Sequence, residues 1–290
     1  MIRVLTLFLR KIIILLEMIK IEHTVFALPF AFMGALLGAR SLPSGPQAFN
    51  ILLAMVGARS AAMAFNRLVD ARVDALNPRT ADRALPRGLI SRRTTIIFIA
   101  ASSLLFLWAA GRLNPLCRTL APFALIAVFF YSYTKRFTWA SHFFLGGVLG
   151  LAPLGGWIAV RGEAGLVPLV LGGAVLLWVA GFDILYSLQD EEFDRASGLF
   201  SLPARLGRVE SLKIARWLHL GAALGFFLCG WLAGLGWVYW GALGLAGLLL
   251  VWEHRLISPS DLSRLQQAFL TLNGLVGLLL SLGTLFSVWP

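Results

Sequence analysis

Apolar segments long enough to cross a lipid bilayer follow one another along almost the whole chain, and they constrain its fold more than any other feature. A helix needs about 20 apolar residues to cross the hydrocarbon layer. Segments of about this length lie at 24–40, 46–66, 94–111, 118–134, 141–160, 165–189, 211–232, 235–252 and 266–288. Hydrophobic residues make up 59% of the 290 residues and charged residues only 13%, which excludes an ordinary soluble domain. We therefore predict an integral membrane protein.

The nine segments are predicted to be helices. In hydrocarbon each backbone N–H and C=O must be paired within the protein, which permits helices and closed barrels. The strands of a membrane barrel would alternate apolar and polar residues with a period of two, whereas these segments are apolar throughout. We predict an all-α polytopic fold with nine transmembrane helices, in a single domain over residues 1–290.

Residues 1–20 differ from the nine segments. Arg10 and Lys11 lie in the middle of a short apolar run, and no cleavage site of small residues follows it, so a signal peptide is not indicated. We expect an amphipathic helix that lies in the membrane interface and leads into the first crossing.

Basic residues are concentrated on one side of the predicted membrane. One set of loops holds the Lys and Arg residues near the N-terminus, between 67 and 93, at 135 and 136, between 195 and 216, and at 255 and 264. The opposite set holds only Arg40, Arg112, Arg118 and Arg161. Cytoplasmic loops carry the excess of Lys and Arg. We therefore expect the N-terminus and the basic loops in the cytoplasm and the C-terminus outside after nine crossings.

The net charge of +11 would also suit a protein that binds nucleic acid. The charges, however, lie in short loops next to the membrane and beside acidic motifs, where anionic lipid and an anionic substrate explain them better. We predict no nucleic-acid partner. No segment has the composition of a soluble domain, so no protein partner is inferred.

A first polar cluster closes the second apolar segment. Asn66, Asp70 and Asp74 follow one another at intervals of four residues, so they lie on one face if the helix continues through them. A loop that begins at Asn77-Pro78 follows. Its arginines include Arg79 and Arg83.

A second polar cluster closes the sixth apolar segment. Asp190 and Asp194 lie one turn apart, and Asp183 and Tyr186 precede them on nearly the same face, deeper toward the membrane. Asp190 follows Asp70 by 120 residues, and four crossings separate the two clusters. The two helices are therefore expected to run parallel and to deliver both clusters to the cytoplasmic side.

Charged residues in or beside a membrane span cost about 2.5–3.5 kcal/mol each at mid-helix, so they usually mark function. Solvation in loops explains Glu191, Glu192 and Asp82, but it does not explain two ladders of carboxylates. Between the clusters, the fourth segment ends in YSYTKRFT, which brings Lys135 and Arg136 to the same side. Composition alone favours an anchoring role in the membrane interface for this basic pair.

Four carboxylates that converge without His or Cys ligands suit a hard divalent cation, and oxygen ligands favour Mg²⁺. Their mutual repulsion makes more than one ion plausible. The nearby arginines and the Lys135-Arg136 pair complement phosphate oxygens. Mg²⁺ and basic residues together suit the departure of a diphosphate, and in a membrane the natural diphosphate is that of an isoprenoid.

Three segments resemble motifs of the UbiA superfamily of intramembrane prenyltransferases. NRLVDARVDALNPRTADRALPRG is similar to the NxxxDxxxD motif of that family, and DILYSLQDEEFD is similar to its second motif, DxxYxxxDxxxD. YSYTKRFT resembles the YPxxKRxT segment of the 4-hydroxybenzoate polyprenyltransferase branch. The resemblance implies nine helices around a central cavity, with cytoplasmic loops capping the active site.

The resemblance also implies roles for individual residues. The residues that would hold Mg²⁺ and the diphosphate are Asn66, Asp70, Asp74, Asp190 and Asp194. Arg79, Arg83, Lys135 and Arg136 would contact phosphate or shape the site. Asp183 and Tyr186 would lie nearer the reacting centre. The implied reaction moves a polyprenyl group from polyprenyl diphosphate to an aromatic acceptor in quinone biosynthesis, and we favour 4-hydroxybenzoate as the acceptor.

Two positions depart from the family pattern, and two alternative functions stay open. Ser132 takes the place of a Pro, and Phe200 takes the place of a Lys for which Arg195 or Arg205 is a candidate substitute.

Within the family, a naphthoate-type acceptor of menaquinone biosynthesis is the alternative. From a different class, a secondary transporter would also use intramembrane carboxylates, although here they cluster at helix ends.

Overall fold

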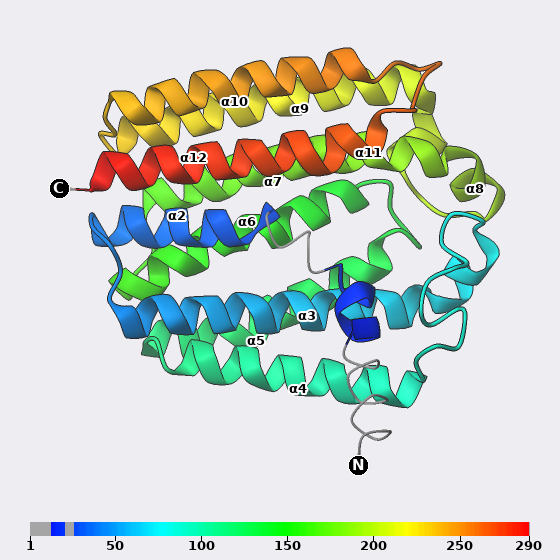
Figure 1. Cartoon of the computed structure of the whole chain (residues 1–290), viewed down its shortest axis with the longest axis horizontal. Coiled ribbons are helices and arrows are strands. Elements are labelled where there is room, and N and C mark those ends of the chain that lie inside the picture. The colour runs from blue at the N-terminus through cyan, green and yellow to red at the C-terminus, as the bar shows by residue number, and fades with distance from the viewer. Residues whose placement is uncertain (1–12, 21–25, 290) are drawn as a thin grey trace.

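The computed structural model describes residues 13–20 and 26–289, and in this part of the chain all regular structure is helical (Figure 1). The long helices are α2 (Leu28–Ala39), α3 (Gly45–Leu76), α4 (Arg92–Gly111), α5 (Pro115–Thr134), α6 (Ser141–Arg161), α7 (Leu166–Ser187), α9 (Leu202–Leu232), α10 (Trp237–Leu256) and α12 (Asn273–Val288). The short elements are a 3₁₀ turn (Leu188–Asp190), α8 (Glu191–Ala196), α11 (Leu265–Gln267) and a π-helical turn (Ala268–Leu272). The predicted all-α class is confirmed.

Each of the nine predicted crossings corresponds to one long helix, although the count of nine is approximate. Seven helical stretches in the described residues are both long enough and apolar enough to cross a membrane. The other two helices are α2, which has only 12 residues, and α10, whose last turn carries His254 and Arg255. Of the predicted interfacial helix, residues 13–18 are helical, and residues 1–12 lie outside the described part.

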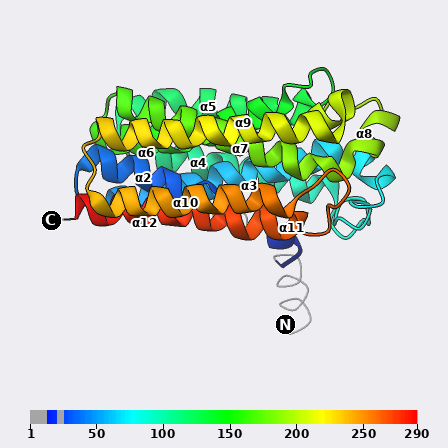
Figure 2. The same cartoon turned by 90° about the horizontal axis from the view of Figure 1, so that it is seen from above.

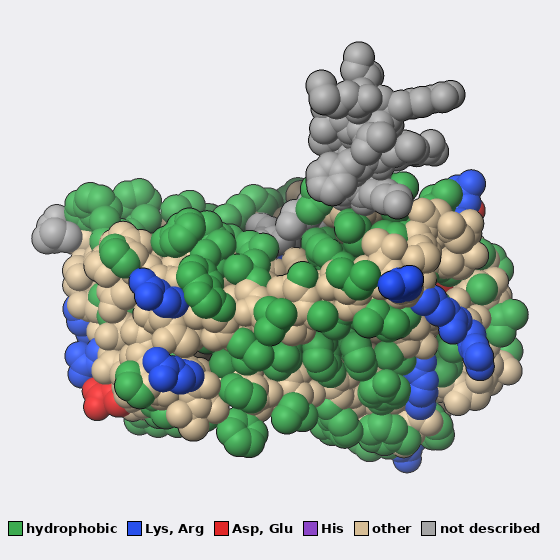
Figure 3. Space-filling model, turned by 90° about the horizontal axis from the view of Figure 1, so that it is seen from below, with side chains coloured by type: hydrophobic (Ala, Val, Ile, Leu, Met, Phe, Trp, Pro, Cys, Tyr) green, Lys and Arg blue, Asp and Glu red, His purple; other side chains and the backbone are tan. Residues whose placement is uncertain are grey.

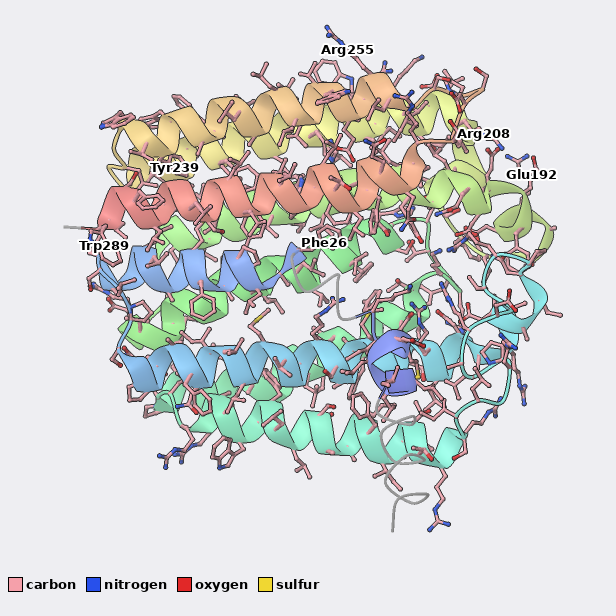
Figure 4. The ribbon with its side chains drawn as sticks, in the orientation of Figure 1. Phe26, Glu192, Arg208, Tyr239, Arg255 and Trp289 are labelled. Atoms are coloured by element: carbon pink, nitrogen blue, oxygen red, sulfur yellow. The ribbon has the colours of Figure 1, made fainter. Side chains whose placement is uncertain are left out.

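The long helices run side by side along the longest axis of the molecule (Figures 1 and 2). The loops that follow α3, α5, α7 and α10 gather at the end that holds α8. Arg208 and Glu192 lie at this end, whereas Tyr239 and Trp289 lie at the opposite end (Figure 4). Hydrophobic side chains cover the middle of one long face, and Lys and Arg lie toward its two ends (Figure 3). This distribution suits a bundle that crosses a bilayer.

Glycines bring α6 into close contact with its two neighbours. A Cβ added at Gly156 would lie 1.9 Å from the carbonyl oxygen of Ala31 in α2. At Gly146 an added Cβ would lie 2.3 Å from the carbonyl oxygen of Leu176 in α7. Because lipid supplies no hydrophobic driving force between helices, small residues that permit close approach stabilise such contacts. α6 thereby connects α2 to α7.

Local sequence explains why α3 carries the first polar cluster on one face. The helix begins after Ser44, whose hydroxyl accepts a hydrogen bond from the Gln47 N–H, while the Gln47 side chain accepts from the Ser44 N–H. It continues to Leu76, ten residues beyond the predicted crossing 46–66, and ends before Asn77-Pro78. The predicted stacking of Asn66, Asp70 and Asp74 requires this extension.

The second polar cluster is less regular than predicted. α7 ends at Ser187, and the chain passes through the 3₁₀ turn Leu188–Asp190 before α8 begins at Glu191. Asp183 and Tyr186 therefore lie on α7, whereas Asp194 lies on α8. The four residues, predicted to share nearly the same face, are thus divided between α7 and α8 by the 3₁₀ turn, and Asp190 occupies the N-cap position of α8.

Candidate active site

A cavity of about 620 Å³ opens between the ends of α3, α5 and α7 at the end of the bundle that holds α8. The predicted site residues that line it are Asn66, Asp70, Asp74, Arg79, Arg83, Lys135, Arg136, Asp183, Tyr186, Asp190 and Asp194. Folding thus brings both polar clusters and the basic pair of the fourth segment to one place.

The carboxylates of the first cluster each accept hydrogen bonds from a different arginine. Asp70 Oδ1 lies 2.8 Å from Arg136 Nη2, and Asp70 Oδ2 accepts from the Asn66 amide at 3.0 Å. Asp74 Oδ1 lies 2.7 Å from Arg83 Nη1. Asp74 is 6% exposed, and the ion pair with Arg83 offsets part of the cost of burying its carboxylate.

The carboxylates of the second cluster also face cations. Arg79 donates to both oxygens of Asp190, from Nε at 2.8 Å and from Nη2 at 2.6 Å, and the Asn77 amide donates to Oδ1 at 3.0 Å. Asp194 is 2% exposed, and its Oδ2 lies 3.9 Å from Lys135 Nζ. Arg79 and Asn77 both follow α3, so these contacts join the loop after α3 to the turn after α7.

Lys135 and Arg79, which lie outside the spanning helices, keep their charge in this environment. Burial lowers the pKa of the Lys135 ammonium, but the negative charges of Asp194, Asp183 and Asp190 outweigh it and raise that pKa above its usual value. Burial also lowers the pKa of Arg79, but the hydrogen bonds and the charge of Asp190 outweigh this effect and raise that pKa above its usual value. Both cations are therefore charged when an anionic ligand arrives.

The carboxylates of the two polar clusters line one cavity, and each lies beside a cation. Within residues 13–20 and 26–289, no three His, Cys, Asp or Glu side chains lie close enough to hold one metal ion. Four carboxylates without a metal would repel one another, and each lies beside a cation instead. The donor set fits a hard cation, because Asp74 Oδ2 and Asp194 Oδ2 are buried oxygens that have no hydrogen-bond partner among the described residues.

Asp183 and Tyr186 line the deeper part of the site on α7. Asp183 Oδ2 lies 2.7 Å from Nδ1 of His142. The Tyr186 ring packs against Phe269 with ring centroids 4.3 Å apart, and its hydroxyl accepts from Arg79 at 3.3 Å. Phe269 belongs to the π-helical turn that precedes α12. An aromatic wall thus lies beside the charged part of the cavity.

Neither candidate substitute for the family lysine is among the residues that line the cavity. The Arg205 guanidinium lies 4.9 Å from the centre of the Trp139 ring. Arg195 pairs with Glu191 at 2.8 Å. The backbone N–H of Phe200 donates to the carbonyl of Lys135 at 2.8 Å. Phe200 thus lies beside the basic pair, but its side chain carries no charge. The assignment of Arg205 to the diphosphate has no support from its position.

A second cavity, of about 240 Å³, adjoins the first and is apolar. The two share Met63, Tyr131 and Leu145 in their walls. Small residues form much of the second cavity, including Ala54, Ala58 and Ala62 of α3 and Ala121 and Ala124 of α5. A ligand with a charged head and a long apolar tail would fit the two cavities together.

Sequence reasoning missed three residues that the structure places at or beside the site. The sequence indicates only a turn at Asn77, yet the side-chain amide of this residue donates to Asp190. Arg67 lines the cavity and donates from Nε to the Met18 carbonyl at 3.3 Å. His142 contacts Asp183. The signal available for His142 was its position in an apolar segment, where an ionisable side chain requires a partner.

Comparison with known proteins gives consistent matches along most of the chain. A sequence model of the UbiA prenyltransferase family matches residues 27–275. A protein of Salmonella newport (strain SL254) named 4-hydroxybenzoate octaprenyltransferase is 31% identical over 250 residues, which cover 85% of this chain and 86% of that protein.

Solved structures give the same result at the level of the fold. The apo structure of a UbiA homologue from Aeropyrum pernix K1 superposes with a TM-score of 0.83 and 36% identity, over 90% of this chain and 96% of that one. A UbiA homologue from Archaeoglobus fulgidus bound to GPP and Mg²⁺ superposes with a TM-score of 0.71, over 95% of this chain and 99% of that one. At 19% identity, this second likeness concerns the fold alone.

Proposed function

Because the chain belongs to the UbiA prenyltransferase family, we propose that it moves a polyprenyl group from its diphosphate to an aromatic acceptor, with 4-hydroxybenzoate as the favoured acceptor and quinone biosynthesis as the context. A naphthoate-type acceptor is the alternative within the family. The secondary-transporter alternative has no support, since the carboxylates lie at helix ends beside cations.

The junction of a charged cavity with an apolar one carries this proposal. Polyprenyl diphosphate has a head with several negative charges and a long hydrocarbon tail. Arg79, Arg83, Lys135 and Arg136 line the first cavity and match the head. The small residues of α3 and α5 line the second cavity and match the tail.

The residues proposed to hold Mg²⁺ are Asn66, Asp70, Asp74, Asp190 and Asp194. Their oxygens would hold Mg²⁺ next to the diphosphate, where the ion would supply positive charge for the leaving group. A precedent for such a ligand pair on this fold is the Archaeoglobus fulgidus homologue whose structure contains GPP and Mg²⁺. One buried oxygen of Asp74 and one of Asp194, which accept no hydrogen bond from the part of the chain that the structure describes, support the assignment here.

The arginines would exchange partners when substrate binds. Arg79, Arg83 and Arg136 now donate to Asp190, Asp74 and Asp70, respectively. An incoming diphosphate offers more charge than a single carboxylate, so the guanidinium groups would turn their N–H donors to phosphate oxygens and release the carboxylates. The resting ion pairs keep the site near neutral until then.

The proposed transfer breaks the bond between the first tail carbon and the diphosphate oxygen. The electron pair leaves with the diphosphate, where Arg79, Arg83, Lys135 and Arg136 stabilise it. The allylic cation, protected from water by the helices and faced by the Tyr186 and Phe269 rings, forms a bond to a ring carbon of the acceptor. That carbon then loses its proton, for which the Asp183 carboxylate is the proposed acceptor.

We further propose that the basic loops and the N-terminus face the cytoplasm of a bacterium and that the C-terminus faces outward across the inner membrane. The relatives from Salmonella and the excess of Lys and Arg in the loops around the cavity support this. A cytoplasmic site would receive soluble aromatic acids from the cell and polyprenyl diphosphate from the bilayer.

A transfer assay on the purified protein in lipid tests the proposal. Farnesyl and longer prenyl diphosphates would be offered with 4-hydroxybenzoate or with a 1,4-dihydroxynaphthoate, in Mg²⁺ or in EDTA, and products would be identified by mass spectrometry. We expect a prenylated acid that forms only with Mg²⁺. Preference for the naphthoate would replace the favoured acceptor, and failure with every aromatic acid in folded protein would contradict the proposed reaction.

A further inference from the structure

His142 is a buried ionisable residue to which the reaction described above gives no role. It lies in the first turn of α6, and its side chain is completely buried. Both ring nitrogens have partners. Nδ1 lies 2.7 Å from Asp183 Oδ2, and Nε2 lies 3.3 Å from the backbone nitrogen of Leu202.

The partner of Nε2 fixes the protonation state of the ring. A backbone N–H can only donate, so Nε2 must offer its lone pair to Leu202. If Nε2 carried a proton, its N–H would face the N–H of Leu202, and two buried donors would lack an acceptor, which is unfavourable. Leu202 is the first residue of α9, where the N–H groups have no acceptor within the helix. His142 satisfies one of them.

The proton of the neutral ring must therefore be on Nδ1, from which it is donated to Asp183. The hydrogen bond at 2.7 Å occupies one of the lone pairs of Oδ2 and fixes the plane of the carboxylate against the ring. Oδ1 is not bonded to the ring, and we assign the uptake of the proton to this oxygen. Asp183 is 22% exposed at its side chain and lines the cavity.

We propose that His142 is a positioning residue that holds the Asp183 carboxylate in the orientation needed to accept the proton from the acceptor ring. The proposal rests on the proposed transferase function and on the role given there to Asp183. His142 acts through Asp183 and does not touch the substrate. α9 fixes the ring, α6 carries it, and α7 carries the carboxylate, so three helices define the direction of Oδ1.

Two amide substitutions separate the two hydrogen bonds of the ring. In His142→Asn the side-chain amide lies near the position of Nδ1, so it can still donate to Asp183 but does not reach Leu202. In His142→Gln the amide lies near the position of Nε2, so it reaches Leu202 and leaves Asp183 without its donor. His142→Leu removes both hydrogen bonds at similar volume. If His142 only satisfies the N–H group at the start of α9, His142→Gln should retain kcat. If His142 positions Asp183, His142→Asn should retain kcat instead.

The test measures kcat, both KM values and the melting temperature of the four proteins, wild type included. We expect kcat to fall about 10- to 100-fold in His142→Leu and His142→Gln, as for other residues that orient a functional group, and to stay within about threefold in His142→Asn. KM for the prenyl diphosphate should stay within about twofold, because the basic residues around the head are unchanged. Full kcat in folded His142→Leu, or rescue by Gln instead of Asn, would overturn the proposal.

Nitrogen NMR of the ¹⁵N-histidine-labelled protein in lipid gives a readout that is independent of turnover. The chain has 4 His, and the His142→Asn spectrum identifies the signals of His142. We expect a neutral ring with the proton on Nδ1, and a shift of that signal in Asp183→Leu. A proton on Nε2 would overturn the inference. Absence of transfer by the wild type with every acceptor would instead contradict the proposed function. The NMR experiment does not depend on turnover, so it distinguishes this outcome from a failure of the inference on His142.

Discussion

Arg79 and Asp190 lie 111 residues apart in the sequence and form a two-point ion pair, with Nη2 2.6 Å from Oδ2 and Nε 2.8 Å from Oδ1. This pair joins the loop after α3 to the turn after α7 and so unites the two polar clusters in one cavity. In the proposed reaction, the Arg79 guanidinium would turn from the Asp190 carboxylate to the diphosphate.

The planar fork of Arg79 gives a first prediction. Lys carries the same charge but cannot make two parallel hydrogen bonds to one anion. Arg79→Lys should therefore raise KM for the prenyl diphosphate about tenfold or more, which corresponds to about 1.4 kcal/mol of binding, with a smaller effect on KM for the acceptor. Steady-state kinetics measure this. Arg195→Lys, in a residue that does not line the cavity, is the matched control, and equal effects in both variants would contradict the prediction.

The acidic residues give a second prediction. Asp70→Ala and Asp190→Ala each remove an oxygen ligand proposed for Mg²⁺ and leave an arginine without its partner. We expect turnover to fall at least about 100-fold, as for the loss of a key electrostatic group, while the protein still inserts and folds. Glu192→Gln is the control, because the Glu192 side chain is 90% exposed. Normal Mg²⁺-dependent turnover in both Ala variants would remove the argument for this metal site.

Arg205 gives a third prediction, opposite to the one drawn from the sequence. Its guanidinium packs on the Trp139 ring and is not among the groups that line the cavity. Arg205→Ala should leave KM for the prenyl diphosphate within about twofold, since a cation–π contact at an exposed site contributes only about 0.5–1 kcal/mol to stability. The same kinetic assay decides this, and a KM raised as in Arg79→Lys would return Arg205 to the diphosphate site.

The apolar cavity gives a fourth prediction. Ala124→Phe would fill space that we assign to the tail. Use of a long prenyl diphosphate should fall about tenfold relative to dimethylallyl diphosphate, because the short tail does not need that space. Competition between the two donors measures the ratio directly. Ala127→Phe lies on the same helix at a position that does not line the cavity, and an equal loss there would point to a general effect on folding.

Two adjacent glycines of α6 give a fifth prediction, on stability. In Gly156→Ala the new Cβ would lie 1.9 Å from the Ala31 carbonyl oxygen, whereas at Gly155 nothing lies within 4 Å. Overpacking of this kind typically costs about 1–3 kcal/mol. The melting temperature in detergent should fall in Gly156→Ala and change little in Gly155→Ala. A similar fall in both would show that the close contact with α2 is not the cause.

Much of the fold follows from the sequence, because the constraint acts within each segment. Hydrocarbon forces a chain to satisfy its own backbone, so apolar length alone predicts helices. The interval of four residues between Asn66, Asp70 and Asp74 predicts one face for the same local reason. The parity of crossings between Asp70 and Asp190 predicts one end of the bundle for both, and they line the same cavity.

Tertiary structure alone decided how the charges of the site are paired. The partners Arg79 and Asp190, Arg136 and Asp70, and His142 and Asp183 come from different elements, and no spacing along the chain encodes their meeting. The packing of Arg205 on Trp139 is likewise a contact between residues distant in the sequence. Apolar length and periodicity are local properties that the sequence determines by itself. Ion pairs form only between side chains that packing has brought within a few ångströms, so only the folded protein shows which carboxylate each cation neutralises.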